Sequence, residues 1–260
     1  MKTTLTFLSL FLLVLSACQS AQPTQPEPVN VEPVQPVPVE PLQPVPVEGF
    51  PTVDYSAGGG GTGSGLCDNP YVPAVEGATW NYSLTTGSGT VTSVQTITDV
   101  GTDGFLLQTE TSDISYVITW KCSPEGLYWL ESTGGMFAAV FQTDAGTATV
   151  ETNSYSGVSM PANVQVGDSW TTDEEITVNG FGVNETFTIH TEYQAVGMET
   201  VTVPAGTFSA LRVDITISNS SQTLPVTIEG SSWFVEGIGQ VKNVANNPSF
   251  DLELTSFSIP

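Results

Sequence analysis

The sequence predicts an all-β fold: an antiparallel meander that forms either a strongly curved open barrel or a sandwich, preceded by a disordered proline-rich stalk. Three observations lead to this prediction. Apolar residues alternate with polar ones from residue 67 onward, turn residues separate the alternating runs, and prolines gather near the N-terminus. No run shows a convincing amphipathic helical pattern, although residues 135–141 fit a short helix as well as a strand.

Alternation with a period of two residues is clearest in residues 114–120, where isoleucine, tyrosine and tryptophan side chains share one face. The pattern recurs in residues 187–193 and 211–217, and more loosely in residues 252–257. β-Branched and aromatic residues in such a pattern are typical of half-buried strands. Many short strands in succession indicate an antiparallel meander.

Turn-forming residues separate these runs, among them Asp103-Gly104 and Asn179-Gly180. In residues 203–208, "VPAGTF", proline suits the first corner of a turn and glycine suits a positive φ angle. The phenylalanine then returns to the core. The pattern therefore predicts a hairpin at this point.

The motif Gly-x-x-Trp occurs three times. We interpret its glycine as the turn into a strand and its tryptophan as a core residue. The alternative is that a curved sheet uses its tryptophans to hold an apolar or sugar ligand. The candidate ligand-lining or core aromatics are the five tryptophans of the chain, Trp80, Trp120, Trp129, Trp170 and Trp233.

The N-terminus has the proportions of a secretory signal peptide, because Lys2 precedes a short apolar run over residues 5–15. The run ends in residues 15–18, "LSAC", which resemble the lipobox of bacterial lipoproteins. The resemblance implies cleavage before Cys18 and a lipid anchor on its sulfur, often with a further acyl chain on its amine. Two or three acyl chains make such an anchor to the lipid bilayer stable.

The residue that follows Cys18 indicates which membrane holds the lipid anchor. In Gram-negative lipoproteins an aspartate at this position commonly signals retention in the inner membrane, whereas this chain has Gln19. The resemblance therefore favours the outer membrane in a host with two membranes. In a host with one membrane, the same anchor leaves the domain at the outer face of the cytoplasmic membrane.

Ten of the 18 prolines lie between Pro23 and Pro51. Proline fixes φ and removes amide donors, so we expect this segment to adopt polyproline II and to act as a stiff spacer, followed by a flexible glycine-rich joint. The sequence thus predicts three parts: a lipoprotein signal peptide (1–17), a lipidated N-terminus with its linker (18–66), and a single β-rich extracytoplasmic domain (67–260).

With Cys18 lipidated, Cys67 and Cys122 remain, and an even pair in an exported protein usually forms a disulfide. Such a bond would attach the start of the domain to the end of its clearest strand. Two thiols without histidine partners make a poor metal site. We expect neither a metal nor a cofactor.

The charge balance narrows the range of partners. The chain has 4 Lys and Arg residues against 27 Asp and Glu residues, a formal net charge of −23. Binding to DNA or RNA requires a positive surface, so nucleic acid is excluded as a partner. The same balance argues against docking on anionic lipids. Membrane association is therefore expected to come from the N-terminus.

The sequence gives little support for catalysis. The only histidine, His190, falls on the polar face of its predicted strand, and no Gly-x-Ser-x-Gly elbow accompanies it. Acidic residues could pair for glycoside hydrolysis, but they are also the ordinary surface residues of this chain. We therefore expect no catalytic residues. The acidic candidates are Asp173-Glu174-Glu175, Asp99, Asp103 and Asp113.

Three segments carry a second resemblance: "VEGATWNY", "GMETVTVPAGTFSALRV" and "WFVEGIGQVK", which begin at residues 75, 197 and 233. They resemble parts of secreted bacterial β-domains of unknown function, including TapB-like proteins. The resemblance implies an antiparallel, curved β-sheet and supplies no catalytic residues.

The leading functional hypothesis is a membrane-anchored surface lipoprotein that is not an enzyme and that binds or carries an apolar or glycan ligand. One alternative is an envelope assembly or scaffolding factor with a protein partner. A hydrolase of envelope polymer is the other.

Overall fold

The computed structural model describes residues 65–112, 114–130, 142–143, 146–147, 149–180, 183–223, 225–246 and 249–260, with backbone only for 142–143, 146–147 and 183. Four predictions fall outside these residues: the signal peptide, the lipidation of Cys18, the stalk as far as residue 64, and the conformation of residues 135–141. Asp113 also lies outside them.

The described residues form strands joined by turns. The first five strands are β1 (Thr79–Thr86), β2 (Gly89–Val100), β3 (Gly104–Glu110), β4 (Ser115–Ser123) and β5 (Gly126–Leu130). The short strands β6 (Gln142–Thr143), β7 (Gly146–Thr147) and β9 (Met160–Pro161) flank β8 (Thr149–Gly157). The last six are β10 (Ser169–Gly180), β11 (Val183–Val203), β12 (Gly206–Asn219), β13 (Thr227–Val235), β14 (Gly239–Asn246) and β15 (Ser249–Ser258).

Thirteen of these strands form one sheet in the order β8-β10-β11-β12-β13-β14-β15-β1-β2-β3-β4-β5-β9, and β6 pairs with β7 separately. Every pairing is antiparallel, and nine of the twelve neighbouring pairs in the large sheet are also neighbours in sequence. The prediction of an antiparallel all-β meander is confirmed. The sheet is open, since β8 and β9 end it on either side. Within the described ranges, no helix is long and apolar enough to cross a membrane.

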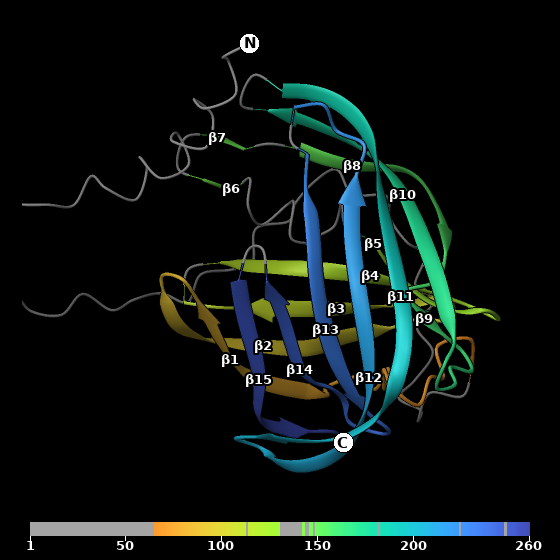
Figure 1. Ribbon diagram of the computed structural model, residues 1–260, viewed down its shortest axis with the longest axis vertical. Helices are drawn as coiled ribbons and strands as arrows, with labels where there is room; N and C mark the ends of the chain where they lie inside the picture. Colours follow the sequence, from red (N-terminus) through yellow and green to blue (C-terminus); the bar gives the residue numbers. More distant parts are fainter. Residues whose placement is uncertain are drawn as a thin grey trace, which may run out of the picture. The chain divides into compact units, whose positions relative to one another are not determined.

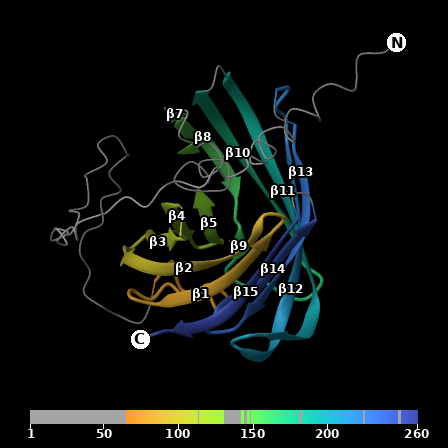
Figure 2. The ribbon, with the colours of Figure 1, turned by 90° about the vertical axis from the view of Figure 1, so that its left-hand side faces the viewer.

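The sheet curves strongly over its length. Strands β1–β3 run across the direction of β11–β14 (Figure 1), and the side view shows the two groups enclosing a concave face (Figure 2). The pairing of β1 with β15 joins these groups, with Thr79 opposite Ser258 and Thr86 opposite Phe250. The fold is therefore a single curved sheet rather than two separate sheets.

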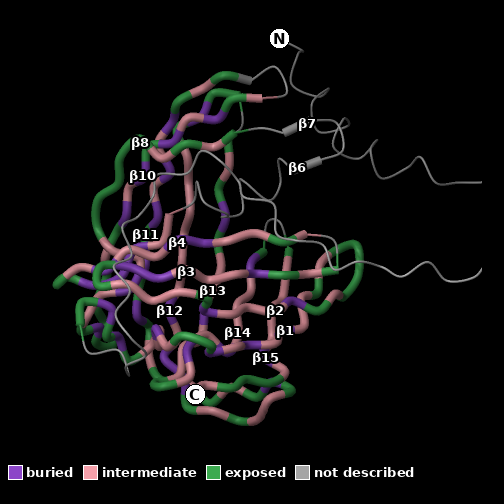
Figure 3. The backbone as a smooth tube through the Cα atoms, turned by 180° about the vertical axis from the view of Figure 1, so that it is seen from behind, coloured by how far each residue is buried: buried purple, intermediate pink, exposed green. Residues whose placement is uncertain are grey.

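The main core gathers side chains from both groups of strands, as the buried segments in Figure 3 indicate. Its fully buried members include Tyr82 and Phe105 from one group, Leu211 and Val213 from the other, and Leu254 from β15, which joins the two groups. A smaller cluster of Ile176, Val178, Phe187 and Ile189 fills the β10–β11 hairpin. Alternate burial along β10 and β11 is the pattern that the sequence predicts for residues 187–193.

Two of the three Gly-x-x-Trp motifs act as predicted. Gly77 and Gly167 have φ angles of 80° and 97°, and β1 and β10 begin two residues later. The prediction is wrong for Gly230, which lies inside β13. A Cβ atom there would approach the carbonyl oxygen of Val244 on β14, so this glycine serves the close approach of two strands.

Candidate functional site: an apolar cavity on the concave face

A cavity of about 250 Å³, partly open to solvent, lies among side chains from both groups of strands. One part of its wall comes from β1–β5 and includes Trp80, Ile97 and Ile118. The other part comes from β11–β15 and includes Tyr193, Ile215, Ile217, Ile228, Phe234 and Phe250. None of its lining residues within the described part of the chain is an Asp, Glu, Lys, Arg or His.

Three aromatic side chains on adjacent strands form one stretch of the wall. Trp120 on β4 lies opposite Phe105 on β3 and Trp129 on β5 in the strand register. The rings of Phe105 and Trp120 are stacked, with centroids 5.5 Å apart and planes 8° from parallel, while Trp129 is tilted by 56° at 6.1 Å. We call Phe105, Trp120 and Trp129 the aromatic wall. Such contacts add to the stability that burial alone provides.

Uncharged polar side chains interrupt the apolar lining at a few points. Gln240 donates to Ser232 across 3.1 Å between β14 and β13. Ser159 accepts a hydrogen bond from the backbone N–H of Trp129 at 3.3 Å. The remaining polar members are Gln95, Thr191 and Asn243. A mostly apolar concavity with a few polar groups is the usual composition of small-molecule sites.

Two buried aromatics attach β1 to β14 and to the residue before it. Trp80 Nε1 donates to the carbonyl oxygen of Ile238 at 2.6 Å, and the Tyr82 hydroxyl donates to the carbonyl oxygen of Gln240 at 2.8 Å. Burial raises the pKa of Tyr82 well above its ordinary value, so this hydroxyl stays protonated. Both bonds fix the part of the wall where β1 faces β14.

The five predicted tryptophans separate into two groups. Trp80, Trp120 and Trp129 line the cavity, whereas Trp170 and Trp233 do not. Trp170 stacks on Tyr193, with ring centroids 5.3 Å apart. Trp233 donates to Glu199 at 2.9 Å and lies 5.8 Å from the Arg212 guanidinium carbon. The sequence had placed all five in one ligand-lining or core set.

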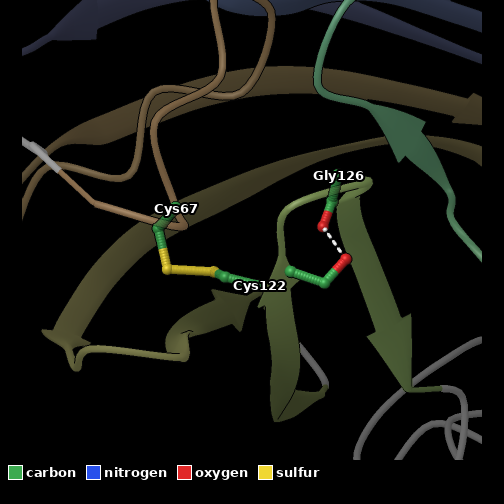
Figure 4. The surroundings of a disulfide bond; sticks show 4 residues. Cys67, Cys122 and Gly126 are labelled. Carbon is green, nitrogen blue, oxygen red and sulfur yellow. Dashed lines mark hydrogen bonds between the residues drawn. A yellow bond between two sulfur atoms is a disulfide. The ribbon is translucent and has the colours of Figure 1, made fainter.

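The segment that opens the domain, residues 65–75, also contributes to the wall through Tyr71 and Val72. A disulfide attaches it to the end of β4: Cys67 and Cys122 are bonded, with Cα atoms 5.0 Å apart (Figure 4). The predicted disulfide is thus confirmed. Beside it, Ser123 donates to the carbonyl oxygen of Gly126 at 3.1 Å, which tightens the β4–β5 turn.

Further hydrogen bonds hold this opening segment in place. Asn69 donates to the carbonyl oxygen of Pro161 on β9 at 3.0 Å. The backbone N–H of Gly237 donates to the carbonyl oxygen of Pro70 at 2.8 Å. The opening segment therefore contacts β4, β9 and the β13–β14 turn, and it places Tyr71 and Val72 against the cavity.

His190 lies on the polar face of β11, as the sequence predicts, with its side chain 40% exposed. Its Nδ1 is 2.7 Å from Asp173 Oδ1 and its Nε2 is 3.8 Å from Glu192 Oε1. The hydrogen bond with Asp173 is the main cause that raises the pKa of His190. In the register Asp173, His190 and Ser218 lie side by side on β10, β11 and β12.

That order of residues matches a catalytic triad, but the arrangement differs from one. In a triad the serine hydroxyl bonds the histidine nitrogen that faces away from the aspartate, and the group opens into a substrate site. Here Nε2 of His190 faces Glu192, and none of the three residues lines the cavity. The geometry therefore shows a surface contact between His190 and Asp173, apart from the cavity.

The acidic candidates do not converge on the cavity. Glu174 is buried, 3% exposed, and accepts hydrogen bonds from other strands, while Glu175 is exposed. Asp99 and Asp103 lie at the end of β2 and in the β2–β3 turn. In the described ranges, no group of three or more His, Cys, Asp or Glu residues could hold a metal ion.

Comparison with known proteins shows a family match over part of the chain and a shared β-rich fold. Residues 136–252 match a family model described as DUF3108-like. A crystal structure from Bacteroides fragilis NCTC 9343, described as an exported protein with a YmcC-like fold, has a TM-score of 0.50 and 14% identity; the match covers 74% of this chain and 100% of that chain. This likeness shows the fold alone.

A second crystal structure, described as that of a lipoprotein from Parabacteroides distasonis ATCC 8503, has a TM-score of 0.49 and 15% identity; the match covers 74% of this chain and 99% of that chain. Among curated proteins, no sequence matches the chain. The comparisons thus give a DUF3108-like β-rich region and a shared fold, without an assigned activity.

Proposed function

We propose that this chain is a lipid-anchored extracytoplasmic binding protein whose β domain holds a small, neutral, apolar molecule in the cavity on its concave face. The observation that carries this proposal is the lining: apolar and aromatic side chains with a few uncharged polar groups, and no charged residue among those described. Concave sites of this composition are where proteins bind small molecules.

The size of the cavity limits the ligand. An engineered apolar cavity of about 150 Å³ holds benzene, and drug-sized ligands occupy pockets of about 300–1,000 Å³. A volume of about 250 Å³ therefore suits a molecule, or the end of a longer one, somewhat larger than benzene. A glycan fits less well, because its hydroxyl groups would need more polar partners than this lining offers.

In this proposal, the N-terminal sequence attaches the protein to a membrane. The lipobox-like residues 15–18 would attach Cys18 to a membrane, and the proline-rich segment would hold the domain away from it. The net charge of −23 would discourage the domain from lying on anionic lipid. The Bacteroides fragilis protein of the same fold is described as exported, which agrees with this location.

A binding role also explains the cavity better than hydrolysis does. Hydrolysis by paired carboxylates needs two acidic groups on either side of the substrate. The described lining has no acidic residue, and the buried Glu174 lies outside it. We therefore propose a carrier or sensor of an apolar molecule rather than an enzyme.

Filling the cavity tests this proposal. Ala245 lies in the lining and is 5% exposed, so Ala245→Leu adds bulk within the cavity. We expect the mature chain without acyl groups to bind toluene saturably in calorimetric titration, and Ala245→Leu to weaken binding at least about tenfold. Ser209→Leu, which adds similar bulk at an exposed position of β12, is the matched control and should bind as the wild type does.

The proposal fails if toluene shows no saturable binding to the wild-type chain. It also fails if Ala245→Leu, folded by circular dichroism, keeps the wild-type affinity.

A further inference from the structure

We infer that the ligand carries an uncharged hydroxyl group and that the side-chain amide of Asn243, on β14, forms a hydrogen bond with it. This inference rests on the proposed function and names the class of ligand that the cavity takes: neutral molecules with an apolar body and a hydroxyl, rather than pure hydrocarbons or ions. Asn243 is then the residue that sets this preference.

The position of Asn243 in β14 directs its side chain toward the cavity. Successive side chains of a strand point to opposite faces of the sheet. Lys242 donates to Glu253 of β15 at 2.6 Å, and neither of these two residues lines the cavity. Asn243 and Ala245 both line it. Asn243 therefore shares the concave face with Ala245, opposite to the face that carries Lys242.

The side-chain amide of Asn243 is available to a ligand. Within the described part of the chain it forms no hydrogen bond with another residue. Asn243 is half-buried, and the oxygen and nitrogen of its amide, unlike the indole nitrogen of Trp120, keep accessible surface. A ligand group in the cavity can therefore approach either atom.

The side chains beside Asn243 toward β13 are small. Ser232 lies directly opposite Asn243 on β13, and Gly230 lies opposite Ala245 two residues along. All four residues line the cavity. Because glycine, serine and alanine fill little space, this part of the wall leaves room for a ligand group next to the amide.

Two other amide side chains line the cavity under different conditions. Gln240 already donates to Ser232 at 3.1 Å, and Ser232 is 0% exposed. Gln95 lies opposite Trp80, a large side chain that is fixed by its hydrogen bond to the carbonyl oxygen of Ile238. Asn243 combines an unbonded amide with small neighbours, so we place the ligand's hydroxyl there.

The chemistry of the amide and of the lining selects the ligand group. A hydroxyl can donate to Oδ1 of Asn243 or accept from its Nδ2, whereas a carbonyl group can only accept. An ion in the cavity would be removed from water without a counter-charge, because no Asp, Glu, Lys, Arg or His stands among the described lining residues. The group that meets Asn243 is therefore neutral.

Three probes of similar size separate these requirements. Benzyl alcohol has a hydroxyl, ethylbenzene has a methyl group at the same position, and benzylamine has an ammonium group there at neutral pH. The experiment measures their dissociation constants for the mature chain without acyl groups, for Asn243→Leu and for Asn246→Leu. Leucine is branched like asparagine but forms no side-chain hydrogen bond. Asn246 is the matched control, because it lies on the same strand, exposed and outside the cavity lining.

We expect Asn243→Leu to reduce the preference for benzyl alcohol over ethylbenzene by about fivefold, because one hydrogen bond to the ligand is lost. Asn246→Leu should change this preference by less than about twofold. The preference is the ratio of the two dissociation constants in one variant, so a general effect of the larger side chain cancels. Benzylamine should not displace ethylbenzene from the wild-type chain.

A second measurement uses the wild-type chain alone. In the ¹³C,¹⁵N-labelled chain, the side-chain amide resonances of Asn243, assigned through its Cβ, should differ between the complexes with benzyl alcohol and with ethylbenzene. This difference should exceed that of the Gln95 amide. Both probes carry the same phenyl ring, so the ring itself contributes similarly to both spectra.

The outcomes separate this inference from the proposed function. If ethylbenzene binds but the preference is unchanged in folded Asn243→Leu, or the Asn243 resonances are the same in the two complexes, the inference is wrong while the proposed binding function stands. Displacement of ethylbenzene by benzylamine also overturns it. If neither neutral probe binds the wild-type chain, both proposals fail.

Discussion

Tyr128 on β5 donates a hydrogen bond to Glu174 on β10 over 3.4 Å, although these strands lie near opposite ends of the 13-stranded sheet. Thr152 on β8 donates to the same carboxylate, and the Tyr128 ring stacks on Tyr155 of β8 with centroids 4.4 Å apart. Glu174 is 3% exposed. The backbone hydrogen bonds between strands do not close the sheet into a barrel. Side chains near its two ends nevertheless contact each other, and these contacts stabilise the curvature of the sheet.

The hydrogen bond between Tyr128 and Glu174 yields the first prediction. Tyr128→Phe removes one donor from a buried carboxylate, which should lower the free energy of unfolding by about 1–3 kcal/mol. Urea denaturation measures this change. Tyr155→Phe is the control, because its ring is 47% exposed and the substitution keeps the stack. Equal stability of the two variants would show that this hydrogen bond contributes nothing to the free energy of unfolding.

The disulfide yields the second prediction. Cys67 and Cys122 are 55 residues apart in sequence, so in the chain-entropy model their bond stabilises the fold by about 4 kcal/mol. We expect the double variant Cys67→Ser/Cys122→Ser to have a lower urea midpoint than the wild type by a corresponding amount. A reductant should lower the midpoint of the wild type and leave that of the double variant unchanged. A wild-type midpoint that is insensitive to reductant would contradict the prediction.

The contact between His190 and Asp173 yields the third prediction, which concerns pH. The pKa of His190 is higher in the folded chain than in the unfolded chain, where it is near 6.5. The contact therefore stabilises the fold fully at pH values below the unfolded pKa, and this stabilisation is lost as the pH rises through the folded pKa. Titration of the His190 ring protons by NMR should give a pKa above 6.5.

Two variants separate the contributions to this pKa. Asp173→Asn should lower it markedly, because the hydrogen bond to Nδ1 is the largest cause of the shift. Glu192→Gln should lower it less, since Glu192 lies 3.8 Å from Nε2. A pKa that is unchanged in Asp173→Asn would show that the contact does not form in solution.

Much of the fold follows from local patterns: the runs that the sequence predicts as strands at residues 187–193 and 211–217 lie within β11 and β12, and the run at residues 114–120 overlaps β4. The looser spacing of residues 252–257 has a structural cause. The register between β1 and β15 shifts, so that Tyr82 faces Leu254 while Trp80 faces Phe257. This β-bulge keeps Leu254 and Phe257 on one face despite their spacing of three residues.

The cavity could be predicted only in part. Alternation predicts that Trp120 lies on an apolar face, but period-two patterns do not show which strands the curved sheet brings together. Ile215 and Phe105 lie on distant strands, and only the curvature brings them to the same cavity. The indole N–H of Trp120 is buried without a hydrogen-bond partner, and no local sequence pattern predicts that environment.

Trp233 yields the last prediction, because it was grouped with the cavity tryptophans and lies outside the cavity. Its neighbours in β13, Ser232 and Phe234, line the cavity, whereas Trp233 bonds Glu199 and lies near Arg212. Trp233→Phe should cost about 1 kcal/mol in the free energy of unfolding through the lost hydrogen bond. Toluene affinity should stay within about twofold of wild type, measured by the same calorimetric titration as for Ala245→Leu. A large loss of affinity in a folded Trp233→Phe chain would mean that the ligand binds elsewhere than on the concave face.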